Sequence, residues 1–588
     1  MSLRDDDAFG GIDPITVEVI RGYLQSTLQN MITRLIRSAL SPNITERMDV
    51  SSAIIDPSGR TVVQLEVAPI HLAELAGAGN SLLESYPIDD ISPGDVFIVN
   101  DCYSGGGTHL PDVTIMMPVF ADERLVGIVA NLAHHVDIGG LGGAGAATIY
   151  DEGLRIPVTR LVEGGVLRED VLRFILLNCR LPEQRRGDLV AQIAANELAA
   201  KDLVQLCDRH GVDTILATYA ALQEYAKRKL RARIREMPEG VYEFVDYLDD
   251  DGSGEATIPV RVVLTVANGE LHVDFAGTAP QTDGNINLVA HGTEGCVLYA
   301  IRTALDPAIP PTSAFLDCVR LSLPERSLVN PSPPAGCRAR VDTAQRVVGV
   351  LLGALAQALP DRLPAGGCDA LQACNLSGDT ADGVFYSTVE TFGGGSGALP
   401  YKDGLDATQI HMANVSNFPL EVGETEYPMR YRRHVLRTDS GGAGKFRGGL
   451  GEIREWELLA PRARLGLHGD RHTIPPWGTA GGLEGVTAEF WVNRGLPDAT
   501  QIPPKVISHA IKQGDVFSVL TPGAGGYGDP KERAPEAVLE DVVNGRVSME
   551  AAQALYGVAV HRREGRFELD DAETLRLRGH VPEASASR

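Results

Sequence analysis

Apolar residues recur every three or four positions near the N-terminus of the chain, which is the spacing of a helix with one buried face. The recurring residues are Ile20, Leu24, Leu28, Met31, Leu35 and Ala39. Asp13 and Pro14 precede them, as expected for an N-cap residue and a proline in the first turn. The pattern therefore predicts a helix that begins at Asp13-Pro14 and ends at Ser41-Pro42.

Two pairs of short apolar segments follow, and a polar turn joins the members of each pair. Residues 46–64 predict a hairpin around the turn at 56–59, with Asp49 at the start of its first strand. Residues 113–120 and 125–130 predict two buried strands joined by the turn at 121–124. We therefore expect the residues just before and just after this second pair to lie close together.

The rest of the chain changes its periodicity several times. Residues 183–235 carry long helical patterns, residues 241–283 alternate with period two, and a further strand-rich stretch follows about residue 430. Since 588 residues are too many for one core, we expect a multidomain protein of the mixed α+β class. The predicted divisions are an N-terminal α/β region (1–240), a middle α+β region (241–430), a β-rich region (431–530) and a helical C-terminal tail (531–588).

Charge and composition exclude several functional classes. The 53 basic and 78 acidic residues give a net charge of −25, which repels nucleic acid and anionic membrane surfaces. No apolar run approaches the roughly 18–20 residues that span a bilayer, and the acidic N-terminus at 1–7 lacks a signal-peptide core. We therefore expect a cytoplasmic protein. The eight cysteines include no C-x-x-C pair, so neither a disulfide framework nor a thiolate zinc site is favoured.

A dense group of histidines and carboxylates indicates a metal site. Residues 100–137 hold three of the fourteen histidines of the chain together with Asp101, Asp112 and Asp137. His109 and Asp112 are three residues apart, and the hairpin at 113–130 brings His134 or His135 back beside them. Imidazole and carboxylate are ligands that suit zinc, manganese or iron.

The same residues allow a second interpretation. Adjacent histidines at the end of a strand also support hydrogen-bond networks without any metal, and His-x-x-Asp alone is a weak signal. Because His134 and His135 point to opposite sides of an extended strand, only one of them can join His109. The spacing alone does not choose between them. Cys102 lies in the same segment, where a small buried side chain is its expected role.

The chain carries no nucleotide-binding motif of a known kind. The glycine-rich segment 442–446 looks like part of a phosphate-binding loop, but Asp439 stands where the first glycine should be. Phe446 replaces the hydroxyl residue that binds magnesium. A dinucleotide fingerprint at the start of a helix is absent as well. We expect ATP, if it is used, to bind elsewhere.

Several long motifs together resemble the hydantoinase B/oxoprolinase family. They are residues 41–51, 69–72, 100–101, 107–112, 134–140, 274–281, 439–449 and 525–530. The resemblance extends over roughly residues 13–560, and it includes subunits of acetone and acetophenone carboxylases. It implies a partner subunit of the hydantoinase A type with an actin-like fold, which binds ATP and phosphorylates a carbonyl oxygen of a small-molecule substrate. It also implies a hetero-oligomer with two or more copies.

The resemblance further implies the residues of the metal site. The ligands of one divalent ion, zinc or manganese, would be Asp49, His109, Asp112 and His134. His135 would support them, and Asp101, Asp137 and His71 are expected to orient ligands or shuttle a proton. For His71, the role of a hydrogen-bonded core histidine is an equal alternative. Such an ion would act as a Lewis acid or would lower the pKa of a bound water.

Three functions remain open at this point. The first is hydrolysis of a hydantoin, lactam or oxoproline ring after ATP-dependent activation. The second is carboxylation of a ketone through a phosphorylated enol, and the motifs shared by both groups of enzymes do not separate the two reactions. The third is a non-catalytic assembly subunit, which four potential metal ligands in one cluster disfavour.

Overall fold

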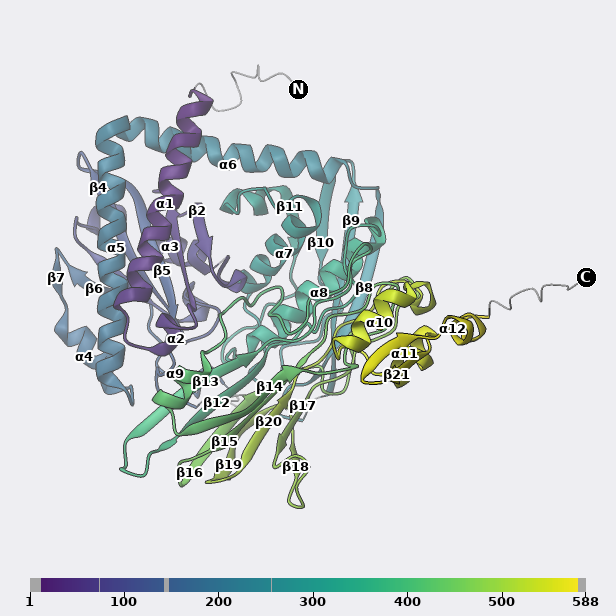
Figure 1. The fold of residues 1–588 in the computed structure, drawn as a ribbon. Coiled ribbons are helices and arrows are strands. Elements are labelled where there is room, and N and C mark those ends of the chain that lie inside the picture. Colours follow the sequence, from purple (N-terminus) through teal and green to yellow (C-terminus); the bar gives the residue numbers. More distant parts are fainter. Residues whose placement is uncertain (1–11, 73, 142–147, 255, 580–588) are drawn as a thin grey trace, which may run out of the picture.

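The computed structural model describes residues 12–72, 74–141, 148–254 and 256–579 of the chain (Figure 1). The prediction made from the acidic N-terminus at 1–7 concerns residues outside these ranges. Within them, no helix is both long and apolar enough to cross a membrane. The architecture is mixed α+β with several sheets, as the sequence predicts.

The N-terminal region is built on a seven-stranded sheet in the order β2-β1-β5-β4-β3-β6-β7. Its strands are β1 (Val50–Ile55), β2 (Thr61–Glu66), β3 (Val96–Val99), β4 (Asp112–Ala121), β5 (Arg124–His134), β6 (Thr159–Glu163) and β7 (Val166–Leu167). Both predicted hairpins, β1-β2 and β4-β5, are confirmed. All neighbouring strands are antiparallel, so the expected α/β label is wrong in its strict sense, which requires parallel strands.

Helices cover both faces of this sheet. On one face pack α1 (Pro14–Ser38), α5 (Pro182–His210) and α6 (Val212–Arg235), and on the other packs α3 (Glu74–Ser85). The predicted first helix is confirmed: Asp13 caps it through Thr16 N, and the predicted stripe from Ile20 to Leu35 is buried. Short helices complete the region, namely α2 (Pro42–Thr45), η1 (Pro69–Leu72), η2 (Ile88–Asp90), η3 (Cys102–Ser104) and α4 (Glu169–Leu177).

A four-stranded sheet, β11-β10-β9-β8, forms the middle of the molecule. Its strands are β8 (Gly240–Asp250), β9 (Ala256–Ala267), β10 (Glu270–Asp274) and β11 (Val319–Ser322). The helices α7 (Ala290–Leu305) and α8 (Arg340–Ala358) pack on it and share one core with η1 and α6, while η4 (Ser313–Cys318) precedes β11. The start of β8 at Gly240 agrees with the predicted change of periodicity.

Two further sheets pack face to face into a sandwich (Figure 1). One contains β13 (Phe385–Phe392), β12 (Gln372–Asp379), β16 (Arg462–His468) and β19 (Val506–Lys512). The other contains β14 (Met429–Leu436), β15 (Glu452–Leu458), β20 (Val516–Leu520), β17 (Glu489–Val492) and β18 (Thr500–Ile502), and α9 (Leu420–Glu426) precedes β14. Because β12 pairs with β16, a boundary at residue 430 would divide a sheet.

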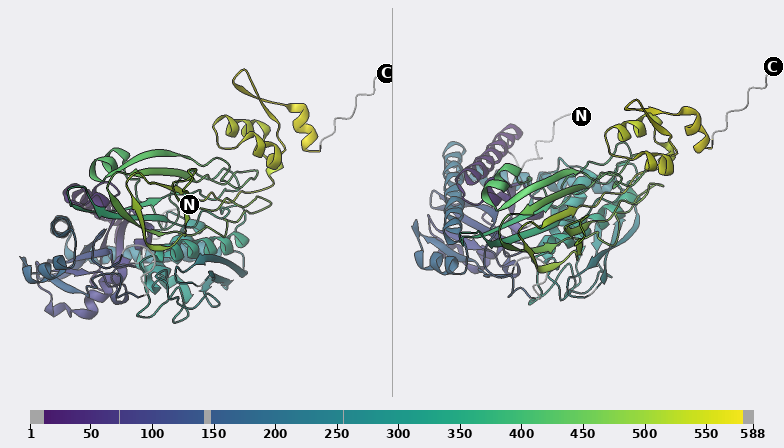
Figure 2. Two further views of the ribbon diagram at one scale, coloured as in Figure 1. Left: turned by 90° about the horizontal axis from the view of Figure 1, so that it is seen from below. Right: turned by 60° about the horizontal axis from the view of Figure 1, so that its bottom comes forward.

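The C-terminal tail contains the predicted helices and a hairpin that the sequence pattern did not indicate. The helices are η5 (Pro530–Glu532), α10 (Pro535–Val543), α11 (Met549–Tyr556) and α12 (Asp571–Leu577). Between the last two lie β21 (Val560–Arg563) and β22 (Arg566–Leu569), joined by a turn with positive φ at Glu564 and Gly565. The tail therefore combines the predicted helices with a short hairpin. Both views of Figure 2 place this unit at one end of the molecule.

Candidate metal centre

Three neighbouring strands of the N-terminal sheet bring candidate ligands together at the same end of the strands. In the β4-β5 register, Asp112 lies directly opposite His134, because the two strands pair without interruption from this end as far as Val119. Asp49 immediately precedes β1, and its carbonyl accepts a 3.1 Å hydrogen bond from the backbone N–H of His134. The predicted hairpin return is confirmed, and the inward histidine is His134.

His109 reaches the same place from the loop that precedes β4. This loop lies close against the strand: a Cβ atom on Gly107 would stand 2.5 Å from Cβ of Asp112, so only glycine fits. The rings of His109 and His134 have their centroids 5.1 Å apart. The side-chain nitrogen of Asn43 lies 3.2 Å from Nδ1 of His134 and donates to its carbonyl at 3.0 Å, which holds that residue in place.

The hydrogen bonds of His109 leave one nitrogen free for a cation. Nδ1 of His109 lies 3.0 Å from the carbonyl oxygen of Arg338 and must donate to it, so Nε2 of the neutral ring carries a lone pair. That Nε2 lies 3.2 Å from Oδ2 of Asp112, and it has no hydrogen-bond partner among the described residues. Two acceptor atoms that face each other in a buried place repel unless a cation lies between them.

The donor set fits a divalent metal ion. Ligand atoms of His109, Asp112 and His134 all lie within 4.8 Å of one another. Asp112 is fully buried and His109 is 5% exposed, and Oδ1 of Asp112 has no hydrogen-bond partner among the described residues. Two imidazoles and a carboxylate are the ligands that zinc and manganese accept. A second group, formed by His71, Glu74 and Asp112, meets the same distance criterion.

Burial sets the protonation of these groups. Burial and the positive charge of Arg340 lower the pKa of His109 to about 4, and burial lowers the pKa of His134 well below its usual value. Both rings are therefore neutral near pH 7, as metal ligation requires. Burial opposes ionisation of Asp112, but the positive charge of Arg340 beside it holds its pKa well below the usual range.

Asp49 and His71 flank the three central ligands. Both line the same pocket, a cavity of about 80 Å³. Nδ1 of His71 lies 2.8 Å from Oγ of Ser51, and its Nε2 lies 4.0 Å from Oδ1 of Asp112, so the structure brings this histidine to the cluster. The carboxylate of Asp49 belongs to neither group of potential ligands, and burial raises its pKa. The structure places Asp49 in the same pocket as the three ligands, and its role as a fourth ligand stays a prediction.

Three other predicted residues have partners elsewhere. The carboxylate of Asp101 accepts hydrogen bonds of 3.0 and 2.9 Å from Arg155. It also accepts one from Oγ of Ser104 in η3. Nε2 of His135 lies 2.9 Å from Oε1 of Gln192 on α5, on the opposite side of the strand from His134. These contacts do not bring Asp101 or His135 to the cluster.

Asp137 is also turned away from the candidate ligands. Its carboxylate accepts hydrogen bonds from the backbone N–H groups of Gly139, Arg180 and Leu181, so it fixes the loop that precedes α5. The expectation that Asp101, His135 and Asp137 orient the metal ligands therefore has no support in the contacts that these side chains make.

The structure adds residues that the sequence pattern did not reveal. Arg340, at the start of α8, donates to Oδ2 of Asp112 at 2.7 Å and to Thr108 Oγ1 at 2.8 Å. Thr108 in turn donates to Glu74, which is fully buried. No local signal marks Arg340, since it comes from a region of the chain with no metal-ligand spacing.

A histidine–carboxylate pair lies across the same pocket. His468, in the last position of β16, lines the cavity, and its Nδ1 lies 3.4 Å from Oδ2 of Asp342. Asp342 is fully buried, and neither of its carboxylate oxygens has a hydrogen-bond partner among the described residues. The pair therefore places an ionisable ring on the side of the pocket formed by the sandwich.

Comparison with known proteins shows the family to which the chain belongs. The sequence matches the hydantoinase B/oxoprolinase family over residues 13–530, and the chain belongs to that family. It is 32% identical to the caprolactamase subunit beta of Pseudomonas jessenii, over 96% of this chain and 98% of the relative.

Solved structures agree with this assignment. The ATP-dependent caprolactamase from Pseudomonas jessenii has a TM-score of 0.90 and 30% identity, covering 97% of this chain and 100% of that one. An acetone carboxylase chain, from a study of ATP-dependent acetone carboxylation, has a TM-score of 0.89 at 19% identity, covering 96% and 82% of the two chains. The second likeness concerns the fold.

Proposed function

We propose that this chain is the metal-binding subunit of an ATP-dependent cyclic amide hydrolase. In this proposal an A-type partner subunit phosphorylates the carbonyl oxygen of the substrate. This subunit then completes the ring opening: water adds to the activated carbon, the C–N bond breaks, and the phosphoryl group leaves as inorganic phosphate. The observation that carries the proposal is the buried pair of facing acceptor atoms, Nε2 of His109 and Oδ2 of Asp112, with His134 directly across the strands.

His109, Asp112 and His134 would hold the ion, and Asp49 and His71 would stand beside it. When bound, a divalent ion supplies Lewis acidity and makes water available as a nucleophile near neutral pH. Arg340 fixes the orientation of the Asp112 carboxylate through its 2.7 Å hydrogen bond, so that this ligand needs little reorganisation when the site fills.

Cleavage of a C–N bond also requires a proton on the departing nitrogen. His468 is the group placed to deliver it, because its ring lines the pocket opposite the ligands while Asp342 stands behind its Nδ1. The 3.4 Å contact with Asp342 keeps this side of the ring facing away from the substrate. The second ring nitrogen would carry the proton to the substrate.

Hydrolysis is favoured over carboxylation by the degree of similarity. The chain is 32% identical to a caprolactamase subunit over nearly its full length, whereas identity to the acetone carboxylase chain is 19%. The designation of that relative as a beta subunit supports the need for a second chain here. A non-catalytic assembly role would not explain why several potential metal-ligating atoms are buried together.

The test is the coupling of ATP hydrolysis to product formation. The chain is assembled with its ATP-binding partner, and ADP and product are measured with hydantoin, caprolactam and 5-oxoproline as substrates. We expect His134→Ala to abolish product while at least part of the substrate-dependent ADP formation remains, because the ion is needed only after phosphorylation. His135→Ala, one residue away on the opposite face, is the matched control and should keep the parent ratio.

If the ratio of ADP to product in the His134→Ala complex equals that of the parent complex, the proposed division of labour is wrong. Size-exclusion chromatography of both variants confirms assembly with the partner. If the parent complex carboxylates a ketone and opens no cyclic amide, the hydrolytic function itself is wrong.

A further inference from the structure

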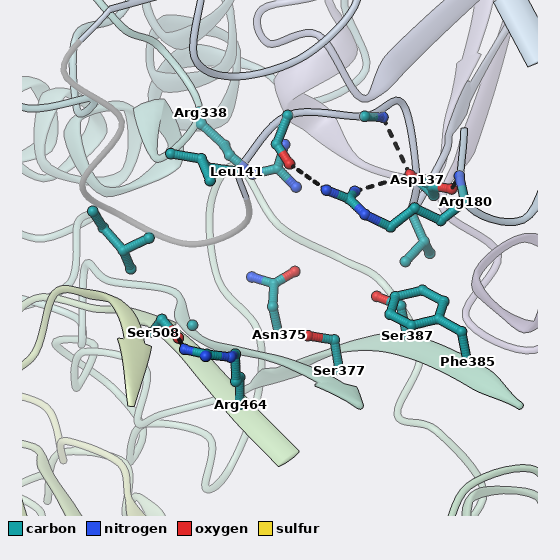
Figure 3. A pocket seen from close by; sticks show the side chains of 15 residues that line it. Asp137, Leu141, Arg180, Arg338, Asn375, Ser377, Phe385, Ser387, Arg464 and Ser508 are labelled. Carbon is teal, nitrogen blue, oxygen red and sulfur yellow. Dashed lines mark hydrogen bonds and ion pairs between the residues drawn. The ribbon is translucent and has the colours of Figure 1, made fainter. Parts of the chain in front are cut away.

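A second cavity, of about 230 Å³, lies between the loop at residues 136–141 and the outer face of the sandwich (Figure 3). Its upper side is formed by that loop together with Arg180 and Arg338. Its lower side is formed by alternate residues of β12, β13 and β16 and by two consecutive residues of β19. Figure 3 shows Asn375 projecting from the sheet into the space below the upper arginines, whereas Arg464 lies along the sheet toward Ser508. Nothing in the proposed function so far uses this cavity.

The cavity adjoins the candidate metal pocket along the same strands. On β12, Ala373 lines the metal pocket, whereas Asn375 and Ser377, two and four residues further along, line the second cavity. On β13, Val389 lines the metal pocket and Ser387 the second cavity. Since alternate residues of a strand share one face, a single sheet face runs beneath both cavities.

Arg338 joins the two cavities and forms no ion pair with an acidic side chain among the described residues. It lines both, and its backbone carbonyl is the acceptor that orients His109. Among the described residues its guanidinium donates to the backbone carbonyl of Glu152 at 3.3 Å and forms no ion pair. The carboxylate of Glu152 accepts instead from backbone N–H groups, and burial raises its pKa to about 7. The carboxylates of Glu152 and Asp137 attract the guanidinium of Arg338, but neither forms an ion pair with it within the described part of the chain.

Arg464 supplies a second cation without a carboxylate partner. It projects from β16, and its Nη1 donates to Oγ of Ser508 at 2.9 Å. No ion pair of Arg464 occurs within the described part of the chain. Arg180, the third arginine of the cavity, is 53% exposed and lies 3.5 Å from Asp137, whose oxygens already accept several backbone hydrogen bonds. In a chain with a net charge of −25, this concentration of arginine stands out.

We propose that this cavity is a binding site for a small oxyanion, the phosphoryl or carboxylate group of a substrate, with Arg338 and Arg464 as its cationic ligands. Ser377, Ser387 and Asn375 supply uncharged donors from the sheet face. Planar guanidinium groups bind two oxygens of such an anion at once, and hydroxyl and amide donors complete its hydrogen bonds. The anion-binding site then lies next to the metal pocket, so one molecule can occupy both.

The inference that the bound molecule also reaches the metal pocket rests on the proposed function. The inference that the cavity binds an oxyanion does not. A cation or an apolar ligand would fit this cavity poorly. Positive charge would be repelled by three guanidinium groups, and an apolar group would leave the arginine and serine donors without water or partner.

The experiment is a titration of the purified full-length chain with inorganic phosphate by isothermal calorimetry, after removal of bound metal with a chelator. Removing metal ensures that phosphate is not bound by an ion. We expect Arg464→Gln to raise the dissociation constant for phosphate at least tenfold and Arg338→Gln to raise it further. Arg462→Gln is the matched control, because Arg462 is exposed on the same strand and does not line the cavity.

A parallel titration with acetate distinguishes the two sources of the anion. Phosphate binding alone assigns the site to a phosphoryl group, and comparable binding of both assigns it to oxyanions that include carboxylates. The proposal is overturned if neither probe binds, if Arg464→Gln binds like the parent, or if Arg462→Gln weakens binding equally. Metal content of Arg464→Gln, measured separately, should match the parent, so a failure here is distinct from a failure of the metal site.

Discussion

Nη2 of Arg340 donates a hydrogen bond of 2.7 Å to Oδ2 of Asp112, although 228 residues separate the two in the chain. Asp112 is fully buried and Arg340 is 6% exposed. The contact ties the start of α8 to the start of β4, so the candidate metal centre depends on two regions of the molecule that pack together. The carboxylate keeps its charge in the interior because this arginine is there.

Replacement of Arg340 by methionine should destabilise the protein strongly. Loss of one partner of a buried ion pair leaves an uncompensated charge, which costs about 3–5 kcal/mol of the free energy of unfolding. Urea unfolding of metal-free protein measures this loss, and added zinc or manganese should recover part of it. Arg168→Met, which breaks an exposed pair with Asp170, should cost far less. Equal losses in both variants would contradict the structural role of Arg340.

Glu152 should make stability depend on pH. Burial raises the pKa of Glu152 from 4.5 to about 7 in the folded chain, so its contribution is most favourable below pH 4.5 and declines as the pH rises through 7. Glu152→Gln keeps an oxygen for the two backbone donors and removes the titration. Relative to the parent, its free energy of unfolding should therefore increase by about 1 kcal/mol between pH 6 and pH 8.5. A constant difference across this range would refute the assignment.

The isolated chain should not hydrolyse ATP. Its glycine-rich segment 442–446 lacks both the first glycine and the hydroxyl residue of a phosphate-binding loop. We expect substrate-dependent ADP formation only after the partner subunit is added. Sustained ATP turnover by the purified chain, at a rate that follows its concentration through a second chromatographic step, would show that a nucleotide site was missed.

Much of the local structure follows from the sequence, whereas the long-range contacts do not. The helix α1 is predictable because its capping residue and its buried stripe lie within one segment, and the β4-β5 hairpin because its turn is short. The same hairpin made the approach of His109 and His134 predictable. Alternation also predicted that only one of His134 and His135 joins the cluster, and the structure shows which.

Residues far apart in the sequence account for what was missed. Arg340 reaches Asp112 from another region, and His468 reaches the pocket from the sandwich, so neither carries a local signal. Asp101 looked like part of the cluster by proximity in sequence, but its carboxylate turns toward Arg155. The pairing of β12 with β16, across about a hundred residues, likewise has no counterpart in local periodicity.

The most direct test of the account is the metal content of two neighbouring variants. The purified chain and its His134→Ala and His135→Ala variants are dialysed against trace metal, and bound metal is measured by mass spectrometry. We predict about one equivalent of zinc or manganese in the parent and in His135→Ala, and a severe loss in His134→Ala, because only His134 faces His109 and Asp112. Full occupancy in His134→Ala, or equal loss in both variants, would contradict the proposed metal centre.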